Sequence, residues 1–369
     1  MNNHFKLNPS YVLGLESSCD ETAASIVARY SDGRTEVLSS IIATQVKEHS
    51  PYGGVVPEIA ARAHMQKIEG LTKDAVKKSG LKFSDIHSIA ATAGPGLIGG
   101  VITGLMCAKG LSLSLGIPLI AINHLEGHAL SPRLSAACPF PYLLLLVSGG
   151  HTQLLSVNGL GDYTRLGSTV DDAAGEVFDK TAKIMNLGFP GGPALERMAA
   201  FGNEMAIDLP RPFNGKPHAD FSFSGLKTAA ARAYAKFENM CEQNKADLAA
   251  SFQKAVTDII CDRSANAMGM FLEKHPNDLR FVVAGGVAAN TAIRQGLERL
   301  CRNKGFTLTA PPLIYCTDNA AMIALAGAEH FAAGNIDGLD AKARPRWPLD
   351  AQSAKENPAS GFGKKGPKS

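Results

Sequence analysis

The sequence predicts an α/β protein built from two similar halves. Each half contains an apolar strand, a short polar turn and a second apolar strand, in residues 11–28 and again in residues 142–157. Each half also contains a later strand that ends in a glycine-rich turn before a helix, in residues 88–115 and 280–300. Alternating strand and helix patterns of this kind are typical of α/β domains. The repeat lies in the architecture and not in residue identity.

In the first half, three short apolar runs are separated by polar turns, as expected for strands. These runs cover residues 11–15, 23–28 and 37–43. Residues 57–78 carry apolar side chains at helical spacing, so we predict a helix there. A strand over residues 88–92, a glycine-rich loop over 93–100 and an apolar helix over 101–115 complete this half.

The second half repeats this order. We predict strands over residues 142–147 and 153–157, joined by a turn, and then a helix over 171–185. A later strand, a Gly285–Gly286 turn and a helix follow, over residues 280–284 and 288–300. An Ala-rich helix over residues 318–331 is expected to return to the first half.

We therefore expect a first domain over residues 11–140 plus 319–349 and a second over 141–318, with an insertion near 186–244. Residues 1–10 are predicted to be a flexible leader. From residue 350 to 369 the chain is rich in Ser, Gly, Lys and Pro, which predicts a disordered basic tail.

The composition excludes several classes of protein. A length of 369 residues with 45% hydrophobic residues suits two domains. The net charge of +3 means that nucleic acid would be held by a local patch. Seven scattered cysteines without a CxxC pair indicate a reducing cytoplasm. The longest apolar runs, such as residues 141–147, are judged too short to cross a bilayer, so we expect no membrane.

His124 and His128 form the most informative pair in the chain. Two histidines four residues apart lie on one face of a helix and can bind one metal ion. A zinc protease would need Glu directly after the first histidine, but Leu125 occupies that place. Glu126 is turned about 200° away from His124 on a helix. Packing of the two histidines without any metal is the alternative.

The glycine-rich turns suggest a bound nucleotide. The polar hairpin turns could offer backbone N–H groups to phosphate oxygens. The Gly285–Gly286 turn would place the N-terminus of the next helix near a ligand. A plain β-turn is the alternative at each position.

Seven ordered motifs of the chain resemble the TsaD family, the tRNA N6-adenosine threonylcarbamoyltransferases once described as O-sialoglycoprotein endopeptidases. The resemblance covers residues 11–349 and is closest to the bacterial branch. The motifs are LGLESSCDET at 13–22, NHLEGH at 123–128, LVSGGHTQ at 146–153, FDKTAK at 178–183, FSFSGLKT at 221–228, AGGVAAN at 284–290 and CTDN at 316–319.

The resemblance implies an actin-like ATPase (ASKHA) fold, with two α/β domains and a ligand cleft between them. It implies transfer of a threonylcarbamoyl group from threonylcarbamoyl-adenylate to N6 of adenosine 37, in tRNAs that read codons beginning with adenine. It also implies a cytoplasmic enzyme that works with tRNA, a TsaB-like paralogue and a TsaE-like ATPase. ATP or the adenylate is the expected ligand.

The resemblance also assigns site residues. It implies one divalent metal ion on His124, His128 and Asp318, with iron(II) favoured and zinc compatible with the same ligands. The substrate contacts that it implies are Val147, Ser148, Gly149, Gly150, His151, Asp179, Gly192, Glu196 and Asn290. The alternatives are ordinary turn chemistry for residues 147–151, a solvated helix carboxylate for Asp179, a helix entry for Gly192 and an exposed polar residue for Asn290.

Two further groups of residues are hypotheses of function. Glu16 and Asp20 stand where actin-like ATPases often carry an acid near metal and phosphate, with turn chemistry as the alternative. Cys19 is expected to be a small buried thiol and not a nucleophile. A candidate patch for the phosphate backbone consists of Lys180, Lys183, Arg197, Arg211, Lys216, Lys227 and Arg232, with a solvated surface as the alternative.

Three competing functions stay open at the level of sequence. A metalloprotease is supported only by the histidine pair. A small-molecule kinase of the same fold would need a carboxylate base, for which Asp179 is the candidate. A non-catalytic ATP-binding scaffold would use the metal for structure alone.

Overall fold

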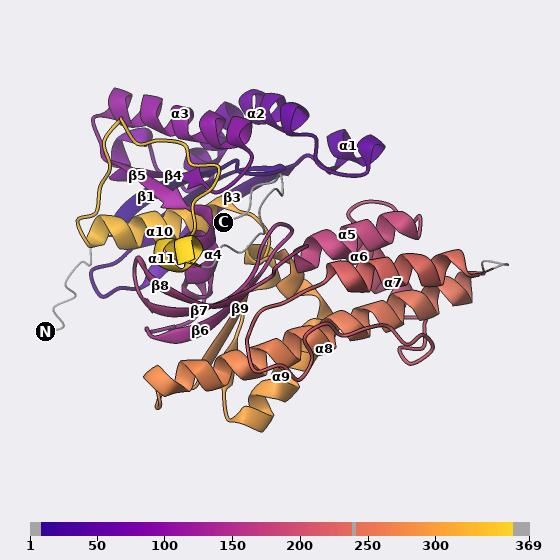
Figure 1. Ribbon diagram of the computed structural model, residues 1–369. Coiled ribbons are helices and arrows are strands. Elements are labelled where there is room, and N and C mark those ends of the chain that lie inside the picture. The colour runs from indigo at the N-terminus through magenta and orange to yellow at the C-terminus, as the bar shows by residue number, and fades with distance from the viewer. Residues whose placement is uncertain (1–8, 238–240, 357–369) are drawn as a thin grey trace, which may run out of the picture. The chain divides into compact units, whose positions relative to one another are not determined.

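The computed structural model describes residues 9–237 and 241–356, which divide into two compact units (Figure 1). The first unit contains the described residues up to His49, together with Val55–Cys138 and Asp318–Trp347. The second contains Ser50–Gly54, Pro139–Thr317 and the described residues from Pro348 onward. Most of the predicted leader and of the predicted tail lies outside the described residues.

The first unit is built on a mixed five-stranded sheet with the strand order β3-β2-β1-β4-β5. β1 (Ser10–Glu16), β2 (Glu21–Arg29) and β3 (Thr35–Thr44) are joined as antiparallel neighbours. β4 (Ser88–Gly94) and β5 (Leu119–Asn123) extend the sheet in parallel with β1. The C-terminal ends of β1, β4 and β5 therefore lie along one edge of the sheet.

Helices cover both faces of this sheet. α2 (Pro57–Lys78) and α3 (Ile98–Leu115) lie on one side and α10 (Ala320–Ala332) on the other (Figure 1). α10 packs directly on β1, because a Cβ placed on Gly14 would lie 2.5 Å from the carbonyl oxygen of Ala320. The short helices α1 (Val46–His49) and α4 (His124–Leu130) complete the unit.

The second unit has the same topology. Its sheet follows the order β10-β9-β6-β7-β8. β6 (Tyr142–Val147), β7 (Thr152–Gly159) and β8 (Asp162–Ser168) are antiparallel neighbours. β9 (Arg280–Ala284) and β10 (Thr307–Thr309) add in parallel with β6. The predicted repeat of architecture is thereby confirmed.

The second unit carries more helices in its described part. These are α5 (Ala174–Ile184), α6 (Gly191–Ala199), α7 (Ser224–Ala235), α8 (Glu242–Lys274), α9 (Thr291–Lys304) and α11 (Ala351–Glu356). α6 and α7 come from the segment predicted as an insertion. Phe221, Phe223 and Leu226 from this segment share one apolar core with Phe252 and Phe271 of α8. The segment is thus part of the core of its unit.

Two expectations differ from the structure in detail. The helix expected over residues 288–300 is divided into a 3-10 turn over Gly286–Ala289 and α9, because Asn290 caps α9 by accepting the N–H of Ile293. The tail expected to be disordered from residue 350 contains α11. Asp350 holds the start of that helix through the N–H and hydroxyl of Ser353 and also accepts the N–H of Arg165.

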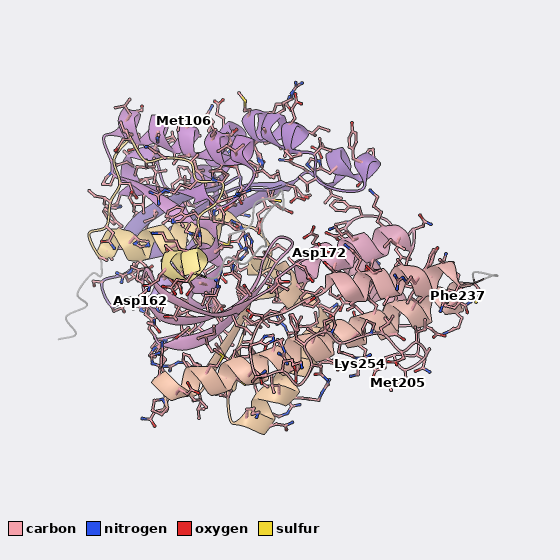
Figure 2. All side chains as sticks on the ribbon, in the orientation of Figure 1. Met106, Asp162, Asp172, Met205, Phe237 and Lys254 are labelled. Atoms are coloured by element: carbon pink, nitrogen blue, oxygen red, sulfur yellow. The ribbon has the colours of Figure 1, made fainter. Side chains whose placement is uncertain are left out.

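The expectation that every apolar run is too short to cross a bilayer is wrong for α3. This helix has 18 residues and a mean hydropathy of 1.5, so its length and composition alone would allow it to cross. Its buried face, with Val101, Leu105 and Ala108, packs into the first unit. Met106 lies on the outer side of the helix and is 46% exposed (Figure 2).

Candidate metal centre and substrate-binding residues

The histidine pair is positioned by the end of β5. α4 begins at His124, directly after the last residue of that strand. Asn123 caps the helix, since its Oδ1 accepts the N–H of Leu125 at 2.9 Å. Its Nδ2 donates to the carbonyl oxygen of Trp347 at 2.9 Å, which ties the cap to a distant segment of the same unit. His124 and His128 then follow one helical turn apart, and both are buried.

Asp318 joins the pair from a distant part of the chain. It stands just before α10, whose N-terminus is capped by Asn319 through the N–H of Met322 at 3.0 Å. Asp318 Oδ1 lies 3.1 Å from Nε2 of His128 and 3.5 Å from Nε2 of His124. The three donor atoms all lie within 4.8 Å of one another.

This donor set fits a divalent metal ion. Bonds of about 2.0–2.2 Å in tetrahedral or octahedral geometry separate neighbouring donor atoms by roughly 3.0–3.5 Å. The two distances from Asp318 to the histidines, 3.1 and 3.5 Å, agree with that separation. Two imidazole nitrogens and one carboxylate also leave coordination positions open, as catalytic metal sites do. The group of His124, His128 and Asp318 is a possible metal site.

The carboxylate of Asp318 and the imidazole of His124 shift each other's pKa values. Burial raises the pKa of Asp318, but His124 and His128 lower it further, so that the pKa lies far below its ordinary value. Burial lowers the pKa of His124, whereas Asp318 and Glu16 raise it, with the net result well above the ordinary value. A cation is therefore electrostatically favoured at this place, as a proton or as a metal ion.

Glu16 contacts the histidine pair from the end of β1. Its Oε2 lies 3.0 Å from Nδ1 of His124, and its carboxylate is fully buried. Thr92 donates its hydroxyl to the same oxygen, and the N–H of Ser18 donates to Oε1 at 2.6 Å. The sequence indicated an acid near the metal at Glu16, but Thr92 and Ser18 were missed. The signal for Thr92 is its place at the end of a strand parallel to β1.

The glycine-rich segment that leads into α3 and forms its first turn packs against other atoms of the protein. A Cβ on Gly100 would lie 2.2 Å from the carbonyl oxygen of Ser17, and one on Gly96 would lie 2.6 Å from the carbonyl oxygen of Ser18. The N–H of Leu97 donates to that same oxygen of Ser18 at 2.7 Å. These glycines allow the start of α3 and the residues before it to hold the turn after β1 in place.

Glu126 faces away from the histidine pair, as its position on the helix predicted. Its Oε2 lies 3.0 Å from Nε2 of His330 on α10. The carboxylate therefore links α4 to α10 and does not stand where the base of a zinc protease would stand. Burial, followed by the neighbouring Asp20, raises the pKa of the Cys19 thiol well above its ordinary value, which makes it a poor nucleophile.

In the second unit, the predicted substrate residues gather at the C-terminal edge of two parallel strands. β6 ends at Val147, one residue after Leu146 pairs with Ala284, and a Cβ on Gly285 would lie 2.3 Å from the carbonyl oxygen of Val147. The turn after β6 is closed by the N–H of Ser148, which donates to the carbonyl oxygen of His151 at 2.8 Å. Edges of this kind are where open α/β sheets bind ligands.

The glycines of this turn differ in their surroundings. A Cβ on Gly149 or Gly150 would meet no atom within 4 Å. A Cβ on Gly175, at the start of α5, would lie 2.6 Å from the carbonyl oxygen of Ser148. The turn therefore rests on α5 on one side and has room beside Gly149 and Gly150 on the other.

The remaining predicted contacts are linked to this turn through α5, α6 and α9. Asp179 lies one helical turn after Gly175, and its Oδ1 accepts the N–H groups of Gly191 and Gly192 at 2.8 and 3.3 Å. Glu196 Oε1 in turn accepts the N–H of Thr291 at 2.8 Å, next to Asn290. The structure thus brings the predicted residues of the second unit into one connected series.

These and a neighbouring bond also change three expectations. The first N–H of α9 is occupied by Glu196, so the N-terminus of that helix is not the open anion site that the Gly285–Gly286 turn suggested. Asp179 uses one oxygen to hold the N-terminus of α6, which does not suit the free carboxylate base of a kinase. Asn290 donates to Gln253 Oε1 at 2.9 Å and is buried, so it is not the exposed polar residue of the alternative.

Several members of the predicted basic patch are paired with carboxylates. Lys227 and Lys180 both contact Asp172, which is labelled in Figure 2, at 2.6 and 3.1 Å. Arg211 contacts Asp258 at 3.2 Å. Because these charges are largely compensated within the protein, these three positions are weaker candidates for binding phosphate than the sequence indicated.

Comparisons with known proteins agree on one family. The family model described as "TsaD: tRNA N6-adenosine threonylcarbamoyltransferase" matches residues 36–325. A protein of that name from Maricaulis maris is 59% identical over 360 residues, which cover 97% of this chain and 96% of the relative. Another from Caulobacter vibrioides is 56% identical over 358 residues and 97% of both chains.

Among solved structures, the full-length HypF crystal structure in its phosphate- and nucleotide-bound form has a TM-score of 0.57 at 14% identity. The match covers 89% of this chain and 56% of HypF. HypF from T. kodakarensis gives a TM-score of 0.58 at 13% identity, over 89% of this chain and 50% of that one. These likenesses bear on the fold alone, and they agree with the predicted actin-like class.

The family model spans most of the chain, and the two relatives exceed half identity over nearly their full lengths. The motifs predicted the family and the enzymatic activity of the chain, and both predictions are confirmed. The chain belongs to the TsaD family, the tRNA N6-adenosine threonylcarbamoyltransferases of tRNA modification.

Proposed function

We propose that the chain transfers the threonylcarbamoyl group of L-threonylcarbamoyl-adenylate to N6 of adenosine 37, in tRNAs that read codons beginning with adenine. His124, His128 and Asp318 are proposed to hold one divalent metal ion for this reaction, with iron(II) favoured over zinc. The observation that carries the proposal is the approach of Asp318 to the histidine pair, in a chain of this family.

The metal ion would supply Lewis-acid stabilisation of charge that develops on the carbamoyl or phosphate oxygens of the donor. The protein's own part is to keep the ligand atoms together. Asn123 and Asn319 cap the helices that carry or follow them, so the three side chains are presented from rigid positions. The metal-binding role of His124 is supported by its burial and by the carboxylates that face both of its ring nitrogens.

The second unit is proposed to bind the adenylate through Val147, Ser148, Gly149, Gly150, His151, Asp179, Gly192, Glu196 and Asn290. The open surroundings of Gly149 and Gly150 support this role, because a ligand can approach the backbone closely there. ATP is the alternative occupant of the same residues. The aromatic N6 amine is a poor nucleophile, so orientation of the donor is expected to contribute more to the rate than removal of a proton.

The partners of the reaction are part of the proposal. A TsaB-like paralogue and a TsaE-like ATPase are expected to be needed with the chain, as is a cytoplasmic supply of the adenylate. The domain boundaries proposed from the sequence, at residues 140 and 319, place His124 and His128 in the first half and the adenylate-binding residues in the second, with Asp318 as the last residue before the second boundary.

A transfer assay tests the proposal. The protein, its partners, synthetic threonylcarbamoyl-adenylate and a tRNA that reads ANN codons are combined, and the nucleosides are analysed by mass spectrometry. We expect a threonylcarbamoyl group on the adenosine beside the anticodon, and loss of both metal and transfer in His128→Ala. His87→Ala, an exposed histidine of the same unit, is the control and should keep both. Full transfer by metal-free protein would contradict the role of the metal.

The adenylate site is tested separately. Gly150→Leu adds a side chain where no protein atom lies within 4 Å of the Cβ, so the protein should fold and yet lose affinity for the adenylate. Gly269→Leu makes the same change at another open position, on the exposed side of α8, and should leave adenylate affinity unchanged. Equal affinities of the two variants in calorimetry would exclude residues 148–151 as the binding turn.

A further inference from the structure

We propose that Glu16 is a positioning residue for the metal site, which orients the ring of His124 and keeps its Nε2 free to bind the ion. The inference rests on the proposed metal-binding function, but it concerns a residue that is not a ligand. The carboxylate lies behind the ligand histidine and contacts the nitrogen on the side away from Asp318.

The carboxylate of Glu16 is held in a single orientation. One oxygen, Oε1, accepts the N–H of Ser18, and the other, Oε2, accepts the hydroxyl of Thr92. Thr92 is adjacent because β1 and β4 run in parallel, with Leu15 opposite Ala91. The side chain is 0% exposed, so water does not compete for these bonds. The acceptor that faces His124 is therefore fixed before any metal binds.

This arrangement decides which nitrogen of His124 keeps its proton when a metal ion binds the other. An ionised carboxylate only accepts hydrogen bonds, so Nδ1 of His124, at 3.0 Å from Oε2, must be the donor. A neutral imidazole with its proton on Nδ1 has a lone pair on Nε2. Nε2 is the atom that lies 3.5 Å from Asp318, on the side of the other donors. Histidine ligands of metals are commonly oriented by a carboxylate in this way.

His128 provides the contrast. Its Nε2 also faces Asp318, but its Nδ1 is buried and has no hydrogen-bond partner among residues 9–237 and 241–356. The carboxylate support is therefore given to only one of the two imidazoles. Removing it should weaken one ligand and leave the other unchanged, which makes the effect on the metal measurable without abolishing the site.

Glu16→Gln is the most informative variant because it keeps the size and shape of the side chain and replaces one hydrogen-bond-accepting oxygen by an NH₂ donor. If the amide oxygen stays with the N–H of Ser18, the amide NH₂ faces Nδ1 of His124 and disfavours a proton there, which then has the hydroxyl of Ser18, at 3.2 Å, as its acceptor. A shift of the ring proton to Nε2 would block the metal. If the amide is reversed, its NH₂ meets the N–H of Ser18, and two donors oppose each other. Neither arrangement preserves all three bonds.

The experiment measures metal binding and not activity. Zn²⁺ affinity is determined by competition with a chromophoric chelator, and the Co²⁺-loaded proteins are compared by visible absorption. We expect Glu16→Gln to lower the affinity by about 10- to 100-fold and to shift the Co²⁺ bands. Glu126→Gln, which changes a buried carboxylate on the same helix as the ligands but paired with His330, should stay within about threefold of wild type.

Two further measurements keep the result unambiguous. Thr92→Val removes the hydroxyl that orients Glu16 without changing a metal ligand, and it should lower the Zn²⁺ affinity by a smaller factor than Glu16→Gln. If Glu16→Gln does not fold, Thr92→Val is measured in its place. His124→Ala tests the ligand set itself. If wild type and His124→Ala bind Zn²⁺ equally, the proposed metal function fails. If His124→Ala loses the metal but Glu16→Gln binds it like wild type with unchanged Co²⁺ bands, only the positioning role is overturned.

Discussion

Two glycines of α3 should respond in opposite ways to the same substitution. Gly100 and Gly110 both lie within this helix, but a Cβ on Gly100 would stand 2.2 Å from the carbonyl oxygen of Ser17, whereas one on Gly110 would meet nothing within 4 Å. Replacement of a helical glycine by alanine stabilises a helix by about 0.5–1 kcal/mol where there is room. Overpacking of a tight contact costs about 1–3 kcal/mol.

Gly110→Ala should therefore raise the unfolding free energy by about 0.5–1 kcal/mol, and Gly100→Ala should lower it by about 1–2 kcal/mol after the helix gain is subtracted. At about 2–4 °C per kcal/mol for a unit of this size, the two melting temperatures should differ by roughly 5 °C in calorimetry. Because Ser17 adjoins Ser18, which holds Glu16, Gly100→Ala should also weaken Zn²⁺ binding. Shifts of the two melting temperatures in the same direction would refute the packing argument.

Three other outcomes follow from the second unit. Burial raises the pKa of Asp172, but its lysine partners lower it to about 2. The ion pair therefore stabilises the fold fully above about pH 4 and this stabilisation is lost as the pH falls toward 2. Lys227→Met should lower the unfolding free energy, measured by urea titration, by about 1 kcal/mol at pH 6 and by less at pH 3. Within residues 9–237 and 241–356, Cys241 is the one exposed cysteine, so the native protein should react rapidly with one equivalent of a thiol reagent and Cys241→Ser should react slowly. Asp179→Ala should speed amide exchange at Gly191, the first residue of α6, while exchange in α8 stays unchanged. Unaltered exchange at Gly191 would show that the carboxylate does not hold the start of α6.

Local patterns in the sequence were enough to locate much of the framework. The predicted bounds of α2, β6 and β9 agree with the structure, because each segment has a clear period and is flanked by turn residues. α8 was not predicted, although it is the longest helix described, with 33 residues. Its buried residues, among them Phe252, Ile260 and Phe271, are too numerous to form the single apolar stripe by which a surface helix is recognised.

At the candidate metal site too, the sequence pattern predicted some residues and not others. The spacing of His124 and His128 placed them on one helix face, and it also excluded Glu126 from the role of a protease base. The sequence by itself therefore determined the chemical class of the ligands. The motif resemblance added Asp318, but spacing could not, since it lies 190 residues from His128.

Only the tertiary structure decided what surrounds these ligands. Glu16 reaches His124 across 108 residues because β1, β4 and β5 run in parallel and end at one edge of the sheet. Asp318 reaches the pair because α10 packs on β1 through the space left by Gly14. Hydrogen-bond direction, burial and the fit of one glycine against a carbonyl group are properties of the packed chain. They depend on distances of a few ångströms between segments, which a one-dimensional pattern does not contain.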